Sequence, residues 1–267
     1  MPAPPYQDYF DLQLRFAARY ALLAGTSLTE AIARCTNLRR RFGLWGSVAE
    51  VRWTDFLRQG EACASHADIV RVVMAKYESG RRRSLSPFGC FAYDPPDAHG
   101  TLRLHFMPDE RHRQASPLAD SCLRDRRAEL TALFMEVRRL YPGVRQVRGL
   151  SWLYHVPAYT SLFPARYAGS VRPATVPLNM TGSSTWGQVL DYRHRLRPGI
   201  ANRVLASLTP SIAHAPWLAF PLQPMSAECA VDAFFDWLGL PRVADSVAPR
   251  SHGQAGPQTP TQSRHLA

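Results

Sequence analysis

The chain has 267 residues, of which 46% are hydrophobic, and it carries a formal net charge of +11 at pH 7. This apolar content excludes a disordered chain, and no run of about 18 apolar residues predicts a membrane span. Almost all of the positive charge is arginine, since Lys76 is the only lysine. Arginine binds phosphate groups in a bidentate fashion, so the charge indicates either a phosphate-binding surface or arginines that are only solvated.

Four helices are predicted in the N-terminal part of the chain. Residues 8–24 place apolar side chains on one face of a helix. The pattern Ser27–Glu30 predicts a capping box at the start of a second helix, which ends near position 42. A short helix around residues 53–57 and a longer one over residues 66–78 complete this helical part.

The middle of the chain changes to a pattern of strands. Residues 101–107 alternate between apolar and polar side chains, and a turn-rich stretch over 94–100 joins them to an aromatic segment over 88–93. This pattern predicts a β-hairpin with one buried face. The elements expected next are a long amphipathic helix over 121–141, a strand over 144–154 and a short helix over 157–163.

The C-terminal part is predicted to be helical apart from its end. Residues 164–182 are irregular, and helices are expected over 183–191, 198–208 and 226–238. Residues 243–267 lack large apolar side chains, so they cannot offset their ordering entropy and are predicted to form a disordered tail. The fold predicted for residues 1–242 is a single folded region of the α+β (or α/β) class. It has a small central mixed sheet, flanking helices, and helical N- and C-terminal parts.

The five cysteines, at positions 35, 63, 90, 122 and 229, are too far apart for a CxxC motif or a Cys/His metal site. Reduced thiols are typical of cytosolic proteins, and the first residues do not resemble a signal peptide. We therefore expect a cytoplasmic protein without a metal site. Cys90 and Cys122 lie near arginines, a setting that favours the reactive thiolate, whereas Cys35 and Cys229 resemble core residues.

The order of hairpin, long helix, strand and short helix over residues 88–163 resembles the second half of GNAT-type N-acyltransferases. In that family the start of the long helix holds the pyrophosphate of an acyl-CoA, and a tyrosine after the strand often acts as general acid. The family's glycine-rich phosphate loop is missing, because no glycine lies between Gly100 and Gly143.

This resemblance implies an acyltransferase that uses acyl-CoA as donor and a small molecule or an amine as acceptor. It implies Tyr159, in the short helix after the predicted strand, or Tyr154, at the end of that strand, as the general acid. The residues that it implies for the donor's phosphates are Arg111, Arg113 and Arg124.

A cluster of polar and aromatic residues, Ser151–His155, closes the predicted strand over 144–154. Sites in α/β proteins collect at such strand ends, so His155 is a candidate general base near neutral pH. The other interpretation is a core strand with aromatic packing and one hydrogen-bonded imidazole. His105 lies on the polar face of its strand and is a weaker candidate.

Three arginine clusters, at 39–41, 81–83 and 111–113, suit the phosphate groups of a nucleic acid. They are not accompanied by the spacing of a helix-turn-helix, an RNA-recognition motif or a zinc finger. Two alternatives to an enzyme therefore remain open. One is a nucleic-acid-binding or regulatory protein, and the other is a protein that binds a partner through its helical ends.

Overall fold

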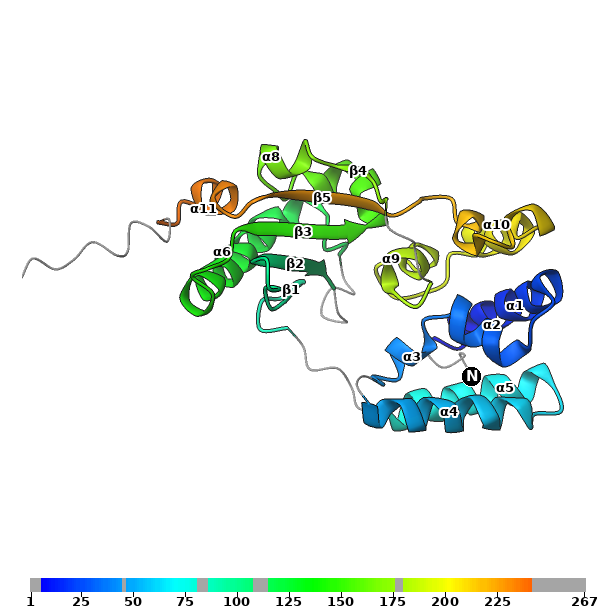
Figure 1. The fold of residues 1–267 in the computed structure, drawn as a ribbon. Helices are drawn as coiled ribbons and strands as arrows, with labels where there is room; N and C mark the ends of the chain where they lie inside the picture. The colour runs from blue at the N-terminus through cyan, green and yellow to red at the C-terminus, as the bar shows by residue number, and fades with distance from the viewer. Residues whose placement is uncertain (1–5, 45–46, 81–85, 108–114, 176–179, 242–267) are drawn as a thin grey trace, which may run out of the picture.

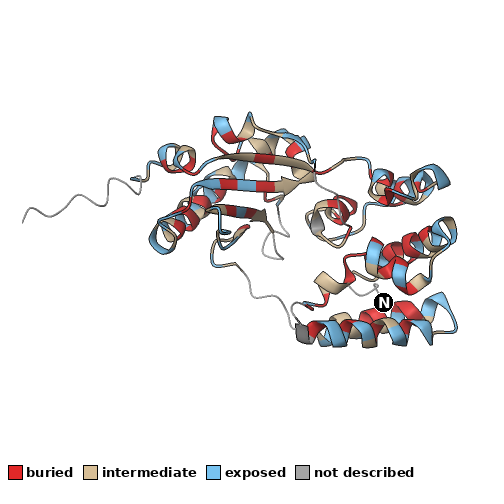
Figure 2. Ribbon diagram, viewed as in Figure 1, coloured by how far each residue is buried: buried red, intermediate tan, exposed pale blue. Residues whose placement is uncertain are grey.

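The computed structural model of the chain describes residues 6–44, 47–80, 86–107, 115–175 and 180–241. Figure 1 shows a sheet with its helices on one side of the molecule and a group of helices on the other. The buried hydrophobic residues likewise form two clusters, which Figure 2 shows in red. We name the two regions the helical part (the described residues of 6–80 and 180–220) and the sheet part (those of 86–175 and 225–241).

The helical part begins with five helices: α1 (Gln7–Ala24), α2 (Leu28–Cys35), α3 (Leu38–Arg41), α4 (Ser47–Glu61) and α5 (His66–Ser79). The predicted capping box is confirmed, because Ser27 and Glu30 satisfy each other's backbone N–H groups at the start of α2. The second predicted helix is wrong in its length, since the chain turns after Cys35 and restarts as α3. α4 is much longer than the predicted short helix, because Trp53 and Phe56 on it pack against Phe42.

Residues 180–220 return to the N-terminal helices and complete the helical part. This segment contains α9 (Ser183–Trp186), η4 (Gly187–Val189), α10 (Pro198–Ser207), η5 (Pro210–Ile212) and η6 (Pro216–Ala219). The indole of Trp186 is fully buried and donates a hydrogen bond of 2.9 Å to the carbonyl of Cys35. Its ring also packs edge-to-face on Phe16 and Phe220, so this one residue joins both ends of the helical part.

The sheet part contains β1 (Phe91–Asp94), β2 (Thr101–Phe106), β3 (Gln146–Ser151), β4 (Arg172–Pro173) and β5 (Met225–Ala230), in the order β1-β2-β3-β5-β4. Only the β2–β3 pair is parallel, and the other pairs are antiparallel. The predicted α+β class with a small mixed sheet is confirmed. The predicted hairpin is also confirmed, since β1 and β2 are antiparallel neighbours.

Helices cover one face of this sheet and provide its core. They are η2 (Asp120–Cys122), α6 (Leu123–Leu140), η3 (Trp152–His155), α7 (Pro157–Thr160), α8 (Ala165–Ala168) and α11 (Asp232–Leu238). Phe134 of α6 stacks on Phe234 of α11, with ring centres 4.5 Å apart, and Phe163 and Tyr167 also pack on Phe234. One aromatic cluster therefore joins helices from distant parts of the sequence.

Two predicted elements of the sheet part are wrong. Residues 226–238 form a strand followed by a helix, because Ala227 and Cys229 alternate with polar residues along β3 before α11 begins at Asp232. The strand expected to continue to Tyr154 ends at Ser151, whose hydroxyl accepts the N–H of Leu153 and starts η3.

The opposite face of the sheet is polar. Asp94, Arg103, Arg148 and Glu228 are register neighbours on β1, β2, β3 and β5, so they form one row across the sheet. Arg148 binds Glu228 at 2.9 Å, and Arg172 of β4 also pairs with Glu228. This polar row explains why polar side chains alternate with apolar ones along the sequence of each strand.

Within the described ranges, no helix combines the length and the apolar character needed to cross a bilayer. The predicted tail over 243–267 lies outside the described residues. That residues 1–242 form one folded region stays a prediction.

Candidate functional site

The parallel strands β2 and β3 separate before they end. Their pairing runs from Thr101 opposite Gln146 to Leu104 opposite Gly149, although each strand continues for two more residues. His105 and Phe106 pair only with β1, and Leu150 and Ser151 pair only with β5. We call these four residues the open end of the β2–β3 ladder. The carboxyl ends of neighbouring parallel strands are where side chains of functional sites collect.

Two groups border this open end from other elements. The carbonyl of Leu150 accepts a hydrogen bond of 3.1 Å from the hydroxyl of Ser184, which belongs to α9 of the helical part. The indole nitrogen of Trp152 lies 3.2 Å from the position that a Cβ atom on Gly187 would occupy. The open end of the ladder therefore lies where the sheet part meets the helical part.

His105 is the titratable side chain of the open end itself. Its Nε2 atom lies 2.9 Å from Oδ2 of Asp94, whose side chain projects from the same polar face of the sheet. The imidazole is 25% exposed, whereas the carboxylate is 60% exposed. An imidazole oriented by a carboxylate through one nitrogen keeps the other nitrogen, here Nδ1, for proton transfer.

The surroundings keep the His105 imidazole neutral. Burial is the main effect that lowers its pKa, and Asp94 opposes this effect by stabilising the imidazolium. The positive charges of Arg40 on α3 and Arg103 on β2 lower the pKa further. His105 is therefore placed to accept a proton near neutral pH, and Arg40 brings the helical part into its electrostatic environment.

Tyr154 and Tyr159, the predicted acids, lie in the core next to the open end. The hydroxyls of Tyr154 and Tyr167 are 2.6 Å apart, and burial raises the pKa of Tyr154, Tyr159 and Tyr167. A Cβ atom at Gly149 would overlap the hydroxyls of Tyr154 and Tyr167. The last residue of β3 that pairs with β2 must therefore be glycine. Burial also keeps all three phenols protonated.

His155, the predicted base, is exposed on η3, and its Nε2 atom is 2.9 Å from the carbonyl oxygen of Gln223. This contact ties η3 to the segment that leads into β5. The structure thus brings His105, Tyr154 and Tyr159 to the open end of the ladder, with the tyrosines on its helix-covered side. It places His155 at the surface, against a backbone carbonyl.

The start of α6 lies at the same end of the sheet. The N–H of Met107, just after β2, binds the carbonyl of Cys90 at 2.7 Å, and the N–H of Cys90 binds Glu129 of α6 at 3.0 Å. Of the arginines predicted to bind phosphate, Arg124 is exposed in the first turn of α6. Arg111 and Arg113 lie outside the described residues.

Arg126, also in the first turn of α6, is a buried cation that the sequence did not single out. Its side chain is 3% exposed, and one terminal nitrogen pairs with Glu129. Its Nε and Nη1 atoms are buried and have no hydrogen-bond partner among the described residues. An unsatisfied buried guanidinium is costly, so this position favours an additional acceptor.

Among the described residues, neither the cysteines nor a group of metal-binding side chains forms a second site. Burial raises the pKa of Cys35 to about 12 and that of Cys229 to about 11, so both thiols stay protonated. Cys90 is buried and Cys122 is partly buried at the start of α6. In the part of the chain that the structure describes, His, Cys, Asp and Glu side chains form no group of three that could hold a metal ion.

The sequence pattern indicated His105 only as a weaker candidate for a functional residue and did not indicate Asp94 as one. Both lie on the polar face that the strand alternation predicts, and a hairpin brings β1 and β2 side by side, so this pair could have been found. Arg40 gave no such signal, because its approach to His105 depends on how the helical part packs.

No family model, curated protein or solved structure matches the chain.

Proposed function

We propose that this protein is an acyltransferase that moves an acyl group from a CoA thioester to an amine. The observation that carries the proposal is the open end of the β2–β3 ladder. Two parallel strands joined by α6 separate there, at the end of the sheet where α6 begins. Such an opening lets an extended donor reach the centre of a sheet from its edge, beside acid–base groups.

The order of the elements supports the same proposal. Hairpin β1–β2, helix α6, parallel strand β3 and the short helix α7 follow one another in the order on which the resemblance to GNAT-type acyltransferases rests. The glycine-rich phosphate loop of that family is still missing. The exposed Arg124 and the unsatisfied N–H groups of Arg126 supply positive charge at the start of α6 instead.

In the proposed reaction, His105 removes one proton from the acceptor's ammonium group through Nδ1, and Asp94 stabilises the imidazolium that forms. The free amine nitrogen attacks the thioester carbonyl carbon, forming a C–N bond while the C–S bond breaks. The thiolate of CoA is protonated by water or by a phenol of Tyr154 or Tyr159. The second proton on nitrogen passes through water to the group that protonated the thiolate, so that group ends neutral. The products are an amide, CoA and the proton held by His105.

Donor binding is tested by the melting temperature of the protein with and without millimolar acetyl-CoA and longer acyl-CoAs. A bound donor raises the melting temperature, because it binds only the folded state. We expect Arg124→Ala to reduce this rise. Arg139→Ala is the matched control, since Arg139 is an exposed arginine near the other end of α6. No rise with any donor would contradict the proposal.

Catalysis is tested by the release of free CoA thiol in the presence of a mixture of amino acids and polyamines. We expect His105→Gln to lower the rate by about 10²-fold or more, a typical loss for a general base. His99→Gln is the control, because His99 is exposed in the hairpin turn. Equal rates in the two variants would remove His105 from the mechanism.

Arg39 and Arg41, two members of the 39–41 cluster, do not favour the nucleic-acid alternative. Arg39 pairs with Glu50 at 2.6 Å, and Arg41 lies over the rings of Tyr6 and Tyr9, at 5.2 and 5.1 Å from their centres. These members of the 39–41 cluster are engaged within the fold. The clusters at 81–83 and 111–113 lie outside the described residues.

A further inference from the structure

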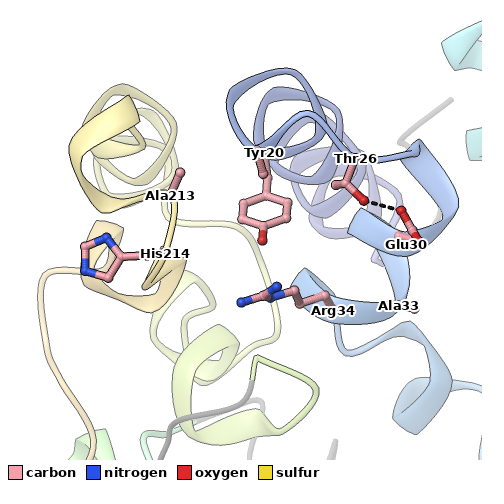
Figure 3. A pocket seen from close by; sticks show the side chains of 8 residues that line it. Tyr20, Thr26, Glu30, Ala33, Arg34, Ala213 and His214 are labelled. Atoms are coloured by element: carbon pink, nitrogen blue, oxygen red, sulfur yellow. Dashed lines mark hydrogen bonds between the residues drawn. The ribbon is translucent and has the colours of Figure 1, made fainter.

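A hollow lies on the helical part, between the end of α1, helix α2 and the turn that joins η5 to η6 (Figure 3). Its volume is about 740 Å³, within the range of roughly 300–1,000 Å³ that small-molecule sites have. Ala24, Ala33 and Ala213 line it, and their small side chains leave the space open. This hollow is separate from the open end of the β2–β3 ladder.

One wall of the hollow carries a guanidinium and a phenol. The guanidinium carbon of Arg34 lies 5.7 Å from the centre of the Tyr20 ring, and Figure 3 shows the Tyr20 ring pointing toward Arg34, with Ala213 and His214 across the space from both. Arg34 is exposed and forms no hydrogen bond or ion pair with another described residue. Burial raises the pKa of Tyr20, against the opposing effect of Arg34, so its hydroxyl stays protonated and can donate a hydrogen bond.

The opposite wall comes from a distant part of the sequence and is held in place. His214 is exposed in the turn between η5 and η6. The segment before this turn is fixed to α1, because Nε of Arg19 donates a hydrogen bond of 2.7 Å to the carbonyl of Leu208. The two walls are therefore connected by a specific contact, which keeps Arg34 and His214 on either side of one space.

Glu30 is the carboxylate that lines the hollow, and its hydrogen bonds direct it to the start of α2. Its Oε2 atom accepts from the N–H and the hydroxyl of Ser27, both at 3.1 Å, and from the hydroxyl of Thr26. These hydrogen bonds lower the pKa of Glu30, so it stays negative. A fixed negative charge disfavours a dianion more than a monoanion, which favours a carboxylate over a phosphate as the ligand.

We propose that this hollow binds a small organic carboxylate. The carboxylate accepts hydrogen bonds from the guanidinium of Arg34 and the hydroxyl of Tyr20, and the apolar body of the ligand packs on the three alanines. His214 borders the ligand from the opposite wall. The site does not depend on acyl transfer, so it stands or falls separately from the proposed function.

Benzoate is a suitable probe, and its neutral isostere benzamide tests the need for charge. We expect benzoate, followed by ligand-observed NMR, to bind about tenfold more tightly than benzamide, because its contacts with Arg34 are charge-assisted. We expect Arg34→Gln to weaken benzoate binding by about the same factor. Arg139→Gln on α6 is the control and should bind benzoate like the unmodified protein.

Ala213→Leu provides a second variant, because it fills the hollow from the wall opposite Arg34 and Tyr20 and leaves both of these residues unchanged. It should also weaken benzoate binding. The proposal is overturned if benzoate does not bind at millimolar concentration, or if Arg34→Gln and Ala213→Leu both bind it as the unmodified protein does. Tighter binding of inorganic phosphate than of benzoate would overturn the assignment to carboxylates.

Discussion

The two hydrophobic cores of the molecule are held together in different ways. In the helical part, buried polar side chains join segments that are distant in sequence: Asn37 donates from its amide group to the hydroxyl of Tyr9, and its backbone N–H binds Gln13. Of the buried polar or charged residues among those described, only Arg126 belongs to the sheet part. The sheet part instead relies on strand ladders, although aromatic rings fill both cores.

The difference follows from how each element satisfies its backbone. A helix pairs its own N–H and C=O groups, so its backbone does not specify a neighbour, and side chains such as Asn37 and Trp186 must do so. A strand pairs with its neighbour, so the ladder itself specifies β3 beside β5. Where that ladder stops, between β2 and β3, groups from the helical part such as Ser184 border the sheet part.

Removal of a ring from the sheet core should have the largest effect on stability. Phe134→Ala deletes a fully buried ring that stacks on Phe234, so we expect a loss of about 4 kcal/mol in unfolding free energy. Hydrogen–deuterium exchange measured by mass spectrometry would show faster exchange in β2 and β3, with a smaller change in α1. Trp186→Phe, in the helical core, should give the reverse pattern. Equal changes in both parts would show that the two cores unfold as one unit.

A side chain added at the end of the β2–β3 pairing should have the next largest effect. Gly149→Ala places a Cβ atom onto the hydroxyls of Tyr154 and Tyr167, so we expect a loss of about 2–3 kcal/mol, measured by chemical denaturation. Tyr154→Phe in the same chain should restore part of this loss. Gly60→Ala is the contrasting change in α4 of the helical part. No atom lies within 4 Å of its added Cβ, so it should stabilise the protein by about 0.5–1 kcal/mol.

The smallest of the three effects is the change that His105 causes in the unfolding free energy as the pH falls. Its pKa is lowered in the folded state, so the unfolded chain binds more protons below the ordinary histidine pKa of about 6.5. The contribution of neutral His105 to stability is complete above that pH and is lost as the pH falls toward the lowered pKa. Unfolding free energies at neutral and mildly acidic pH should therefore differ less in His105→Gln than in His99→Gln. An equal difference in both variants would contradict this account of His105.

The elements whose signals are local could be predicted from the amino-acid sequence. The amphipathic patterns of α1 and α6, the capping box at Ser27 and the hairpin of β1 and β2 each depend on residues close in sequence. The alternation in β2 also determined that His105 and Arg103 share the polar face of the sheet. The α+β class followed from these patterns.

The contacts between distant segments depend on tertiary packing and could not be predicted in this way. Residues 226–230 of β5 were predicted as helix because the partner strand, β3, lies about 80 residues earlier and the alternating pattern is short. The return of residues 180–220 to α1 and α2, the approach of Arg40 to His105 and the burial of Tyr154 beneath Gly149 carry no local signature. Burial and pairing between remote segments override local propensity, and they also shape the open end of the ladder and the hollow beside Arg34.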